Sequence, residues 1–227
     1  MTQILLDPGL VIALLLNFYI LTVTNLKQVI YAVALQGALL GVLYPLSHAS
    51  FAEFGGDREV GTFTLVRLAV LTLAIVLFKG SLIPRLLLRA MRAADMRSQL
   101  TSTVGIVPPL LVAAVGTALT LVFVRTLPLA PQHVGHLPIP ASLATVVCGL
   151  LMLSTRREAL GQVLGYIVLE NGIFIFGLLL IEAVPVMVEF GIVLDLFVGV
   201  FVMGIIFNHV SRAFPEASVE HLSRLRE

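Results

Sequence analysis

Long apolar runs recur along this 227-residue chain, and they constrain its fold more than any other feature. Hydrophobic residues make up 59% of the chain and charged residues only 12%, a composition that a water-soluble domain cannot bury. A helix needs about 20 apolar residues to cross the hydrocarbon core of a bilayer. We therefore predict an all-α integral membrane protein with transmembrane helices near residues 5–24, 27–47, 60–79, 104–125, 140–154, 160–182 and 188–210.

Most of the cations lie on one side of these predicted helices. Eleven of the fourteen Lys and Arg fall in the loops after the first, third, fifth and seventh helices or at the edges of those loops. Because cytoplasmic loops carry an excess of Lys and Arg, this pattern predicts seven helices with the N-terminus outside and the C-terminus inside. The segment Met1–Pro8 has no cationic region, so we expect the first helix to be retained and not cleaved as a signal peptide.

Three regions follow from this layout. Residues 1–103 hold the first three helices and a basic cytoplasmic segment, and residues 104–139 hold a connecting helix and an outer loop. Residues 140–227 hold the last three helices and a cytoplasmic tail.

The cytoplasmic segment after the third helix has a pattern of its own. Arg85, Arg89 and Arg92 recur at helical spacing beside an apolar face, which predicts an amphipathic helix. Such a helix lies on the cytoplasmic headgroups or docks a soluble partner, and we favour the membrane surface.

The most informative residue for function is Glu170. It lies about ten residues, or roughly 15 Å, from either end of its apolar run. A carboxylate at that depth costs about 2.5–3.5 kcal/mol on insertion scales, so it must face protein or water. An acid inside the membrane indicates a proton relay or an ion site, and a protonated Glu that only supports packing is the alternative.

Four further residues are candidates for the same relay. Asp195 is a second acid within the last helix, and Arg67 is a cation well inside the third helix, which we expect to pair with Asp195 or Glu170. His209 lies near the cytoplasmic end of the last helix, where it would exchange protons with solvent, and a simple interfacial polar residue is the alternative. Gln36 aligns with Glu170 if the first three helices repeat the last three, although a simple interhelical hydrogen bond is the alternative for this residue.

The sequence shows no motif for a nucleotide, a metal or a redox cofactor. Its single cysteine, Cys148, lies in an apolar run and excludes an internal disulfide or a cysteine-held cluster. We therefore predict no catalytic residues, no metal site and no cofactor in this protein. The net charge of +1 gives no reason to expect a nucleic-acid partner.

The predicted sixth helix, residues 160–182, and the residues just before it resemble a known family. The run from Arg156 to Phe174, which includes Leu169-Glu170-Asn171-Gly172, resembles the hydrogenase-4 component E family. More distantly, the last three helices are similar to the K subunit of proton-pumping NADH-quinone oxidoreductase (complex I) and to the C subunit of multisubunit sodium/proton antiporters. Glu170 matches the first acid of those subunits and Asp195 the second, where the relatives usually have Glu. Helices one to four have no counterpart in the three-helix relatives.

The resemblance implies a membrane-arm subunit of a complex I-related assembly of the hydrogenase-4 or formate hydrogenlyase type. It would be a non-catalytic subunit of an oxidoreductase complex in a bacterial or archaeal cytoplasmic membrane. Its expected partners are antiporter-like membrane subunits, a membrane subunit like the H subunit of complex I, and a peripheral nickel–iron hydrogenase-like arm. A subunit of a cation/proton antiporter and a structural anchor without a proton role are the alternatives.

Overall fold

The computed structural model describes residues 3–54, 62–93, 100, 104–126, 137–180 and 184–213. Every regular element longer than a single bridge in these residues is helical, which confirms the all-α prediction. The elements are α1 (Gln3–Thr22), α2 (Leu26–Phe54), α3 (Thr62–Leu77), the π-helical turn η1 (Phe78–Leu82), α4 (Ile83–Ala93), α5 (Val107–Val124), α6 (Pro138–Thr155), α7 (Ala159–Leu180) and α8 (Pro185–Ala213).

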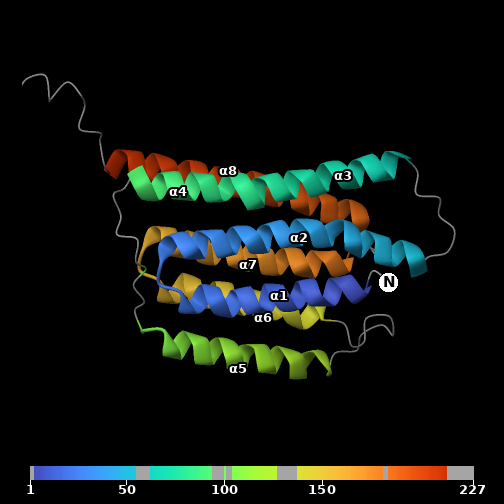
Figure 1. Ribbon diagram of the computed structural model, residues 1–227, viewed down its shortest axis with the longest axis horizontal. Helices are drawn as coiled ribbons and strands as arrows, with labels where there is room; N and C mark the ends of the chain where they lie inside the picture. Colours follow the sequence, from blue (N-terminus) through green and yellow to red (C-terminus); the bar gives the residue numbers. More distant parts are fainter. Residues whose placement is uncertain are drawn as a thin grey trace, which may run out of the picture.

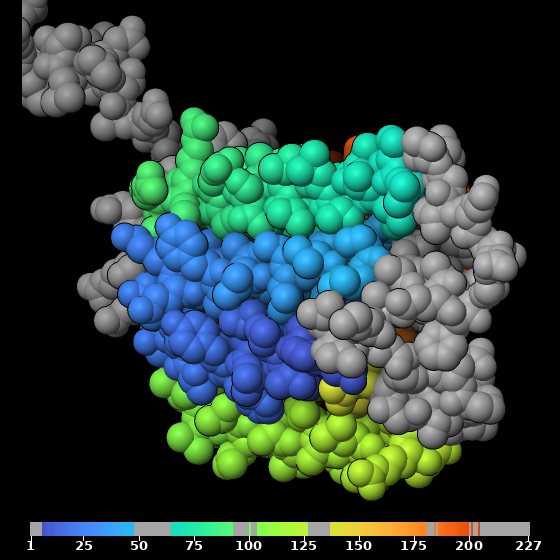
Figure 2. Space-filling model, turned by 45° about the vertical axis from the view of Figure 1, so that its right-hand side comes forward, coloured from blue at the N-terminus to red at the C-terminus, as the bar shows by residue number. Residues whose placement is uncertain are grey.

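The helices lie side by side in a layered bundle (Figure 1). Helices α2 and α7 lie in the middle, α1 and α6 pack on one side of them, and α3, α4 and α8 pack on the other. Helix α5 lies at the edge, against α6 and α1. Figure 2 shows one broad face of this bundle, on which α3–α4, α2, α1 and α5 follow one another as parallel bands.

The lengths and compositions of the helices fit a membrane-embedded protein. Five stretches of the described residues are long and apolar enough to cross a bilayer: Leu26–Ser47, Leu65–Arg92, Val107–Val124, Pro138–Thr155 and Ala159–Leu180. The peripheral helix α5 exposes large apolar side chains such as Leu111, Val115 and Leu119, each more than half accessible. Such a surface suits hydrocarbon rather than water.

The third helix is longer than the sequence analysis predicts. Elements α3, η1 and α4 follow one another without a break, so residues 62–93 form one continuous rod. The predicted helix end at residue 79 is therefore wrong, and α4 is not a separate surface helix. Apolar side chains such as Ile83 and Leu87 are buried against neighbouring helices, which keeps α4 on the line of α3.

Helices α6 and α7 pack closely against each other, and glycine makes this possible. A Cβ atom added to Gly149 on α6 would fall against the backbone of Leu169 on α7. Small residues of this kind let two membrane helices approach closely. Because Leu169 directly precedes Glu170, this contact also fixes the position of the buried acid.

Arg156, at the end of α6, has a buried structural role. Its side chain is almost inaccessible, and its Nη2 donates hydrogen bonds to the carbonyl oxygens of Leu21 at 3.0 Å and Val23 at 3.3 Å. The last carbonyls of a helix have no partner within that helix. Arg156 therefore caps α1 and ties it to the α6–α7 connection.

Candidate functional site: a buried cluster of charged residues

Lys79 is the centre of the site. It belongs to η1, the π-helical turn in the middle of the 62–93 rod, and only 3% of its surface is accessible. The backbone of α2 comes close at this point, because a Cβ atom added to Gly37 would lie 2.7 Å from the Lys79 Cβ. Single π turns inside α-helices are frequent at functional sites. Here the turn places a cation between α2, α7 and α8.

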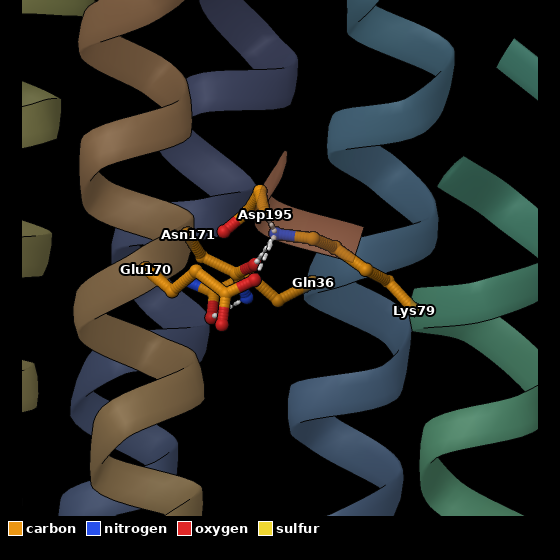
Figure 3. A network of polar contacts seen from close by, with 5 residues as sticks. All are labelled: Gln36, Lys79, Glu170, Asn171 and Asp195. Atoms are coloured by element: carbon orange, nitrogen blue, oxygen red, sulfur yellow. Dashed lines mark hydrogen bonds and ion pairs between the residues drawn. The ribbon is translucent and has the colours of Figure 1, made fainter. Parts of the chain in front are cut away.

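Two acids bind the Lys79 ammonium group (Figure 3). Its Nζ lies 2.8 Å from Asp195 Oδ2 on α8 and 3.3 Å from Glu170 Oε1 on α7. The same atom lies 5.2 Å from the centre of the Phe174 ring, which adds a cation–π contact. One cation thus joins the two acids, which come from different helices.

The cluster is deeply buried and carries an excess of negative charge. The side chains of Lys79, Glu170 and Asp195 are 2%, 5% and 21% accessible. Two carboxylates and one ammonium group give a net charge of −1 when all three are ionised. The second carboxylate oxygen of Glu170, Oε2, is buried without a hydrogen-bond partner among the described residues. An uncompensated charge in such surroundings is costly, so the cluster favours the uptake of one positive charge.

A ladder of uncharged polar side chains extends from Lys79 across the bundle. Lys79 Nζ donates to Asn171 Oδ1 at 3.1 Å, and Asn171 Nδ2 donates to Gln36 Oε1 at 3.2 Å. Gln36 Nε2 then donates to Asn17 Oδ1 at 2.9 Å. Asn17 Nδ2 in turn donates to Thr145 Oγ1 at 2.8 Å. The ladder therefore connects η1, α7, α2, α1 and α6 in that order.

Every hydrogen bond of this ladder points away from Lys79. At the far end, Thr145 donates to the Ala141 carbonyl oxygen within its own helix, at 2.7 Å. Because hydrogen bonds in one direction polarise one another, the ladder stabilises the positive charge at its start. It ends on the backbone of α6, and its effect is to position Lys79.

The predicted pairing of Arg67 was wrong. Arg67 Nη2 lies 2.7 Å from Glu189 Oε1, and Lys79 takes the place that we expected Arg67 to hold beside Asp195 and Glu170. Tyr44 also donates to Glu189, at 3.5 Å. Arg67 lies far from the cluster because twelve residues, about 18 Å along a helix, separate it from Lys79.

The other predicted residues divide into three groups. Gln36 joins the site, but as a ladder member that bonds Asn171 and Asn17 and not as a titrating group. Arg85, Arg89 and Arg92 share an exposed stripe of α4, and their contact with lipid or a partner stays a prediction. His209 lies within α8, but its side chain is outside the part of the protein that the structure describes.

Lys79 was not predicted as a site residue, because a first cation after an apolar run marks the expected end of a membrane helix. A signal was present. Apolar residues continue beyond Lys79 to Leu88, and the whole stretch Leu65–Arg92 reaches 28 residues, about 42 Å long as a helix. Lys79 falls near the middle of that stretch, and a cation inside a helix able to cross a bilayer needs buried acids.

Comparison with known proteins shows similarity to an uncharacterized mycobacterial protein. The uncharacterized protein Rv0085 of Mycobacterium tuberculosis is 31% identical to this chain over 206 residues, which cover 89% of the chain and 87% of the relative. No protein-family model and no solved structure matches the chain. The alignment spans nearly the full length of both proteins, so it includes the helices that carry Lys79, Glu170 and Asp195. The chain therefore belongs to the same family as the uncharacterized mycobacterial protein Rv0085.

Proposed function

We propose that this protein is a proton-relay subunit in the membrane arm of a redox-driven, complex I-related assembly of the hydrogenase-4 or formate hydrogenlyase type. The observation that carries the proposal is the shared contact of Lys79 with two buried acids, at 3.3 Å from Glu170 and 2.8 Å from Asp195. The resemblance of the run from Arg156 to Phe174 to hydrogenase-4 component E supplies the type of assembly.

The charge balance explains how the cluster would work. With all three groups ionised, the site carries a net charge of −1, which a low-dielectric interior disfavours. Protonation of either acid leaves Lys79 paired with the other acid, and the cluster is then neutral. Lys79 contacts both acids at once, so it can strengthen its contact with whichever acid remains ionised. A proton can therefore enter and leave while Lys79 always retains a partner.

The proposal includes an orientation of the protein in the membrane and a set of partner subunits. We place seven spans in a bacterial or archaeal cytoplasmic membrane with the N-terminus outside and the C-terminus inside. With Lys79 buried, ten of the fourteen Lys and Arg still fall on the cytoplasmic side, in agreement with the positive-inside rule. Antiporter-like subunits and a subunit like the H subunit of complex I would flank the protein in the membrane. A peripheral nickel–iron hydrogenase-like arm would supply the redox energy.

Co-purification tests this assignment directly. The tagged protein is extracted from its native membrane in mild detergent, and mass spectrometry identifies the proteins that accompany it. An untagged strain is the control for non-specific capture. We expect a nickel–iron hydrogenase-like large subunit, iron–sulfur proteins and antiporter-like subunits. Antiporter-like subunits alone would replace the redox complex with a cation/proton antiporter, and the protein without partners would contradict both.

A further inference from the structure

A groove between α7 and α8 leads to the buried acids. Its volume is about 490 Å³, and its polar lining residues are Tyr166, Glu170 and Asp195. The other lining residues are glycine or apolar. At its rim, Ile173, Met187 and Leu194 are each more than half accessible, so the groove opens at the bundle surface.

The groove is the accessible side of the charged cluster. On the opposite side, Lys79 and the polar ladder through Asn171 and Gln36 fill the space between the helices. Asp195, which lines the groove, is 21% accessible, whereas Lys79 is 2% accessible. A ligand in the groove would therefore meet the acids before it met the cation.

Glu170 and Asp195 can accept a hydrogen bond from a second positively charged group. Glu170 is only 5% accessible, yet its Oε2 has no hydrogen-bond partner among the described residues. Lys79 balances only one of the two carboxylates. A buried carboxylate oxygen without a partner is best stabilised by a charged hydrogen-bond donor. Glu170 and Asp195 thus favour a cation, and the apolar residues that line the rest of the groove favour an apolar group on the same ligand.

The size of the groove decides what kind of ligand fits. It extends along α7 from Tyr166 to Leu180, which is about 21 Å. A volume of 490 Å³ lies in the range of small-molecule pockets, which are mostly apolar with a few polar groups.

We propose that this groove binds a lipophilic cation with one apolar tail and an ammonium head. The tail lies between α7 and α8, and the head donates hydrogen bonds to Glu170 Oε2 and to Asp195. Binding would neutralise the cluster in the same way as a proton does. The site therefore exists whether or not the cluster relays protons, and it would regulate the relay by competition if it does.

Binding of dodecylammonium to the full-length protein in phosphatidylcholine nanodiscs tests the proposal. Empty nanodiscs correct for partition into lipid, and dodecanol is the neutral probe of equal tail length. We expect saturable binding of one dodecylammonium per protein molecule, at least tenfold tighter than dodecanol, and a loss of at least tenfold in Glu170→Gln. Equal affinity for the two probes, or unchanged binding to Glu170→Gln, would overturn the proposal.

A variant that blocks the groove without disturbing the helix packing shows whether lost binding reflects the site and not misfolding. A Cβ atom added to Gly191, which lines the groove, or to Gly204, which does not, meets no atom within 4 Å. Gly191→Leu should therefore abolish dodecylammonium binding with the bundle intact, and Gly204→Leu should bind as the wild type does. Binding that survives Gly191→Leu would place the probe elsewhere.

The intact complex from native membranes completes the test. If it binds dodecylammonium as the isolated protein does, the groove is open in the assembly and the proposal stands. If only the isolated protein binds the probe, a partner helix covers the groove and the proposal fails. Both outcomes are independent of proton translocation, so failure of the relay and failure of this site are distinguishable.

Discussion

At the scale of single residues, Lys79 makes the site possible. Two carboxylates in one apolar interior repel each other, and each carries a large cost of removal from water. The ammonium group at 2.8 Å and 3.3 Å offsets both effects. The three side chains therefore form one electrostatic unit, and a change in one alters the other two.

Lys79→Met should destabilise the protein strongly. Removal of one partner from a buried ion pair costs about 3–5 kcal/mol, because the remaining charges stay buried without compensation. The free energy of unfolding in detergent micelles measures this loss. The triple variant Lys79→Met, Glu170→Gln and Asp195→Asn should recover most of it, since no charge remains. A triple variant as unstable as the single one would show that packing and not charge explains the loss.

The Arg67–Glu189 pair should matter far less. The Arg67 side chain is 36% accessible and the Glu189 side chain 14%, so this pair is only partly buried, whereas Lys79 is 2% accessible. We expect Glu189→Gln to lower the free energy of unfolding by less than Lys79→Met does and to leave energy coupling unchanged. Translocation assays in native vesicles check the second point. A loss of coupling in Glu189→Gln would place this pair in the relay.

The sequence reveals the acids of this site but not their cation. Glu170 and Asp195 stand out because a short acidic side chain inside an apolar run cannot reach the headgroups. A lysine near the apparent end of such a run looks like an interfacial anchor, since its long side chain can reach the headgroups. Only the continuation of the helix through η1, fixed by tertiary packing of α4, shows that Lys79 is buried.

At the scale of helices, close packing between α6 and α7 aligns the site. The ladder from Lys79 through Asn171 and Gln36 requires a fixed distance between α7 and both α2 and η1. The contact of Gly149 with the Leu169 backbone holds α7 on the opposite side. These partners come from distant parts of the sequence, so the sequence alone indicates an interhelical hydrogen bond for Gln36 but not which residues it joins.

Gly149→Ala should disturb both stability and function. The added methyl group would meet the Leu169 backbone, which cannot rotate away, and overpacking of this kind costs about 1–3 kcal/mol. Because Glu170 follows Leu169, we also expect reduced energy coupling. Gly204→Ala is the matched control, as its methyl group meets no atom within 4 Å. Thermal unfolding of the two variants compares them, and equal midpoints would contradict the packing argument.

At the scale of the whole molecule, the bundle suits a membrane and exposes a basic stripe on α4. Arg85, Arg89 and Arg92 project from α4 on the side opposite its buried apolar residues. The prediction of a separate surface helix fails because α4 continues the line of α3. The stripe itself is exposed, as the arginine spacing predicts.

The triple variant Arg85→Ala, Arg89→Ala and Arg92→Ala tests what the stripe contacts. On the membrane-surface interpretation, which we favour, the variant should keep its partner proteins and lose affinity for anionic lipid, by about 1 kcal/mol per arginine. Co-purification measures the first quantity and liposome flotation the second. Replacement of the same residues by lysine keeps the charge and serves as control. Loss of the peripheral proteins with membrane insertion intact would show that the stripe docks a partner.

Proton uptake by inverted native membrane vesicles tests whether the Lys79–Glu170–Asp195 cluster relays protons. A fluorescent pH probe follows uptake during electron-donor oxidation in wild type, Glu170→Gln and the control Glu189→Gln. We predict that Glu170→Gln abolishes uptake while the complex stays assembled and electron transfer remains measurable, and that Glu189→Gln behaves as wild type. Normal uptake by an assembled Glu170→Gln complex would contradict the relay and leave the cluster a structural role.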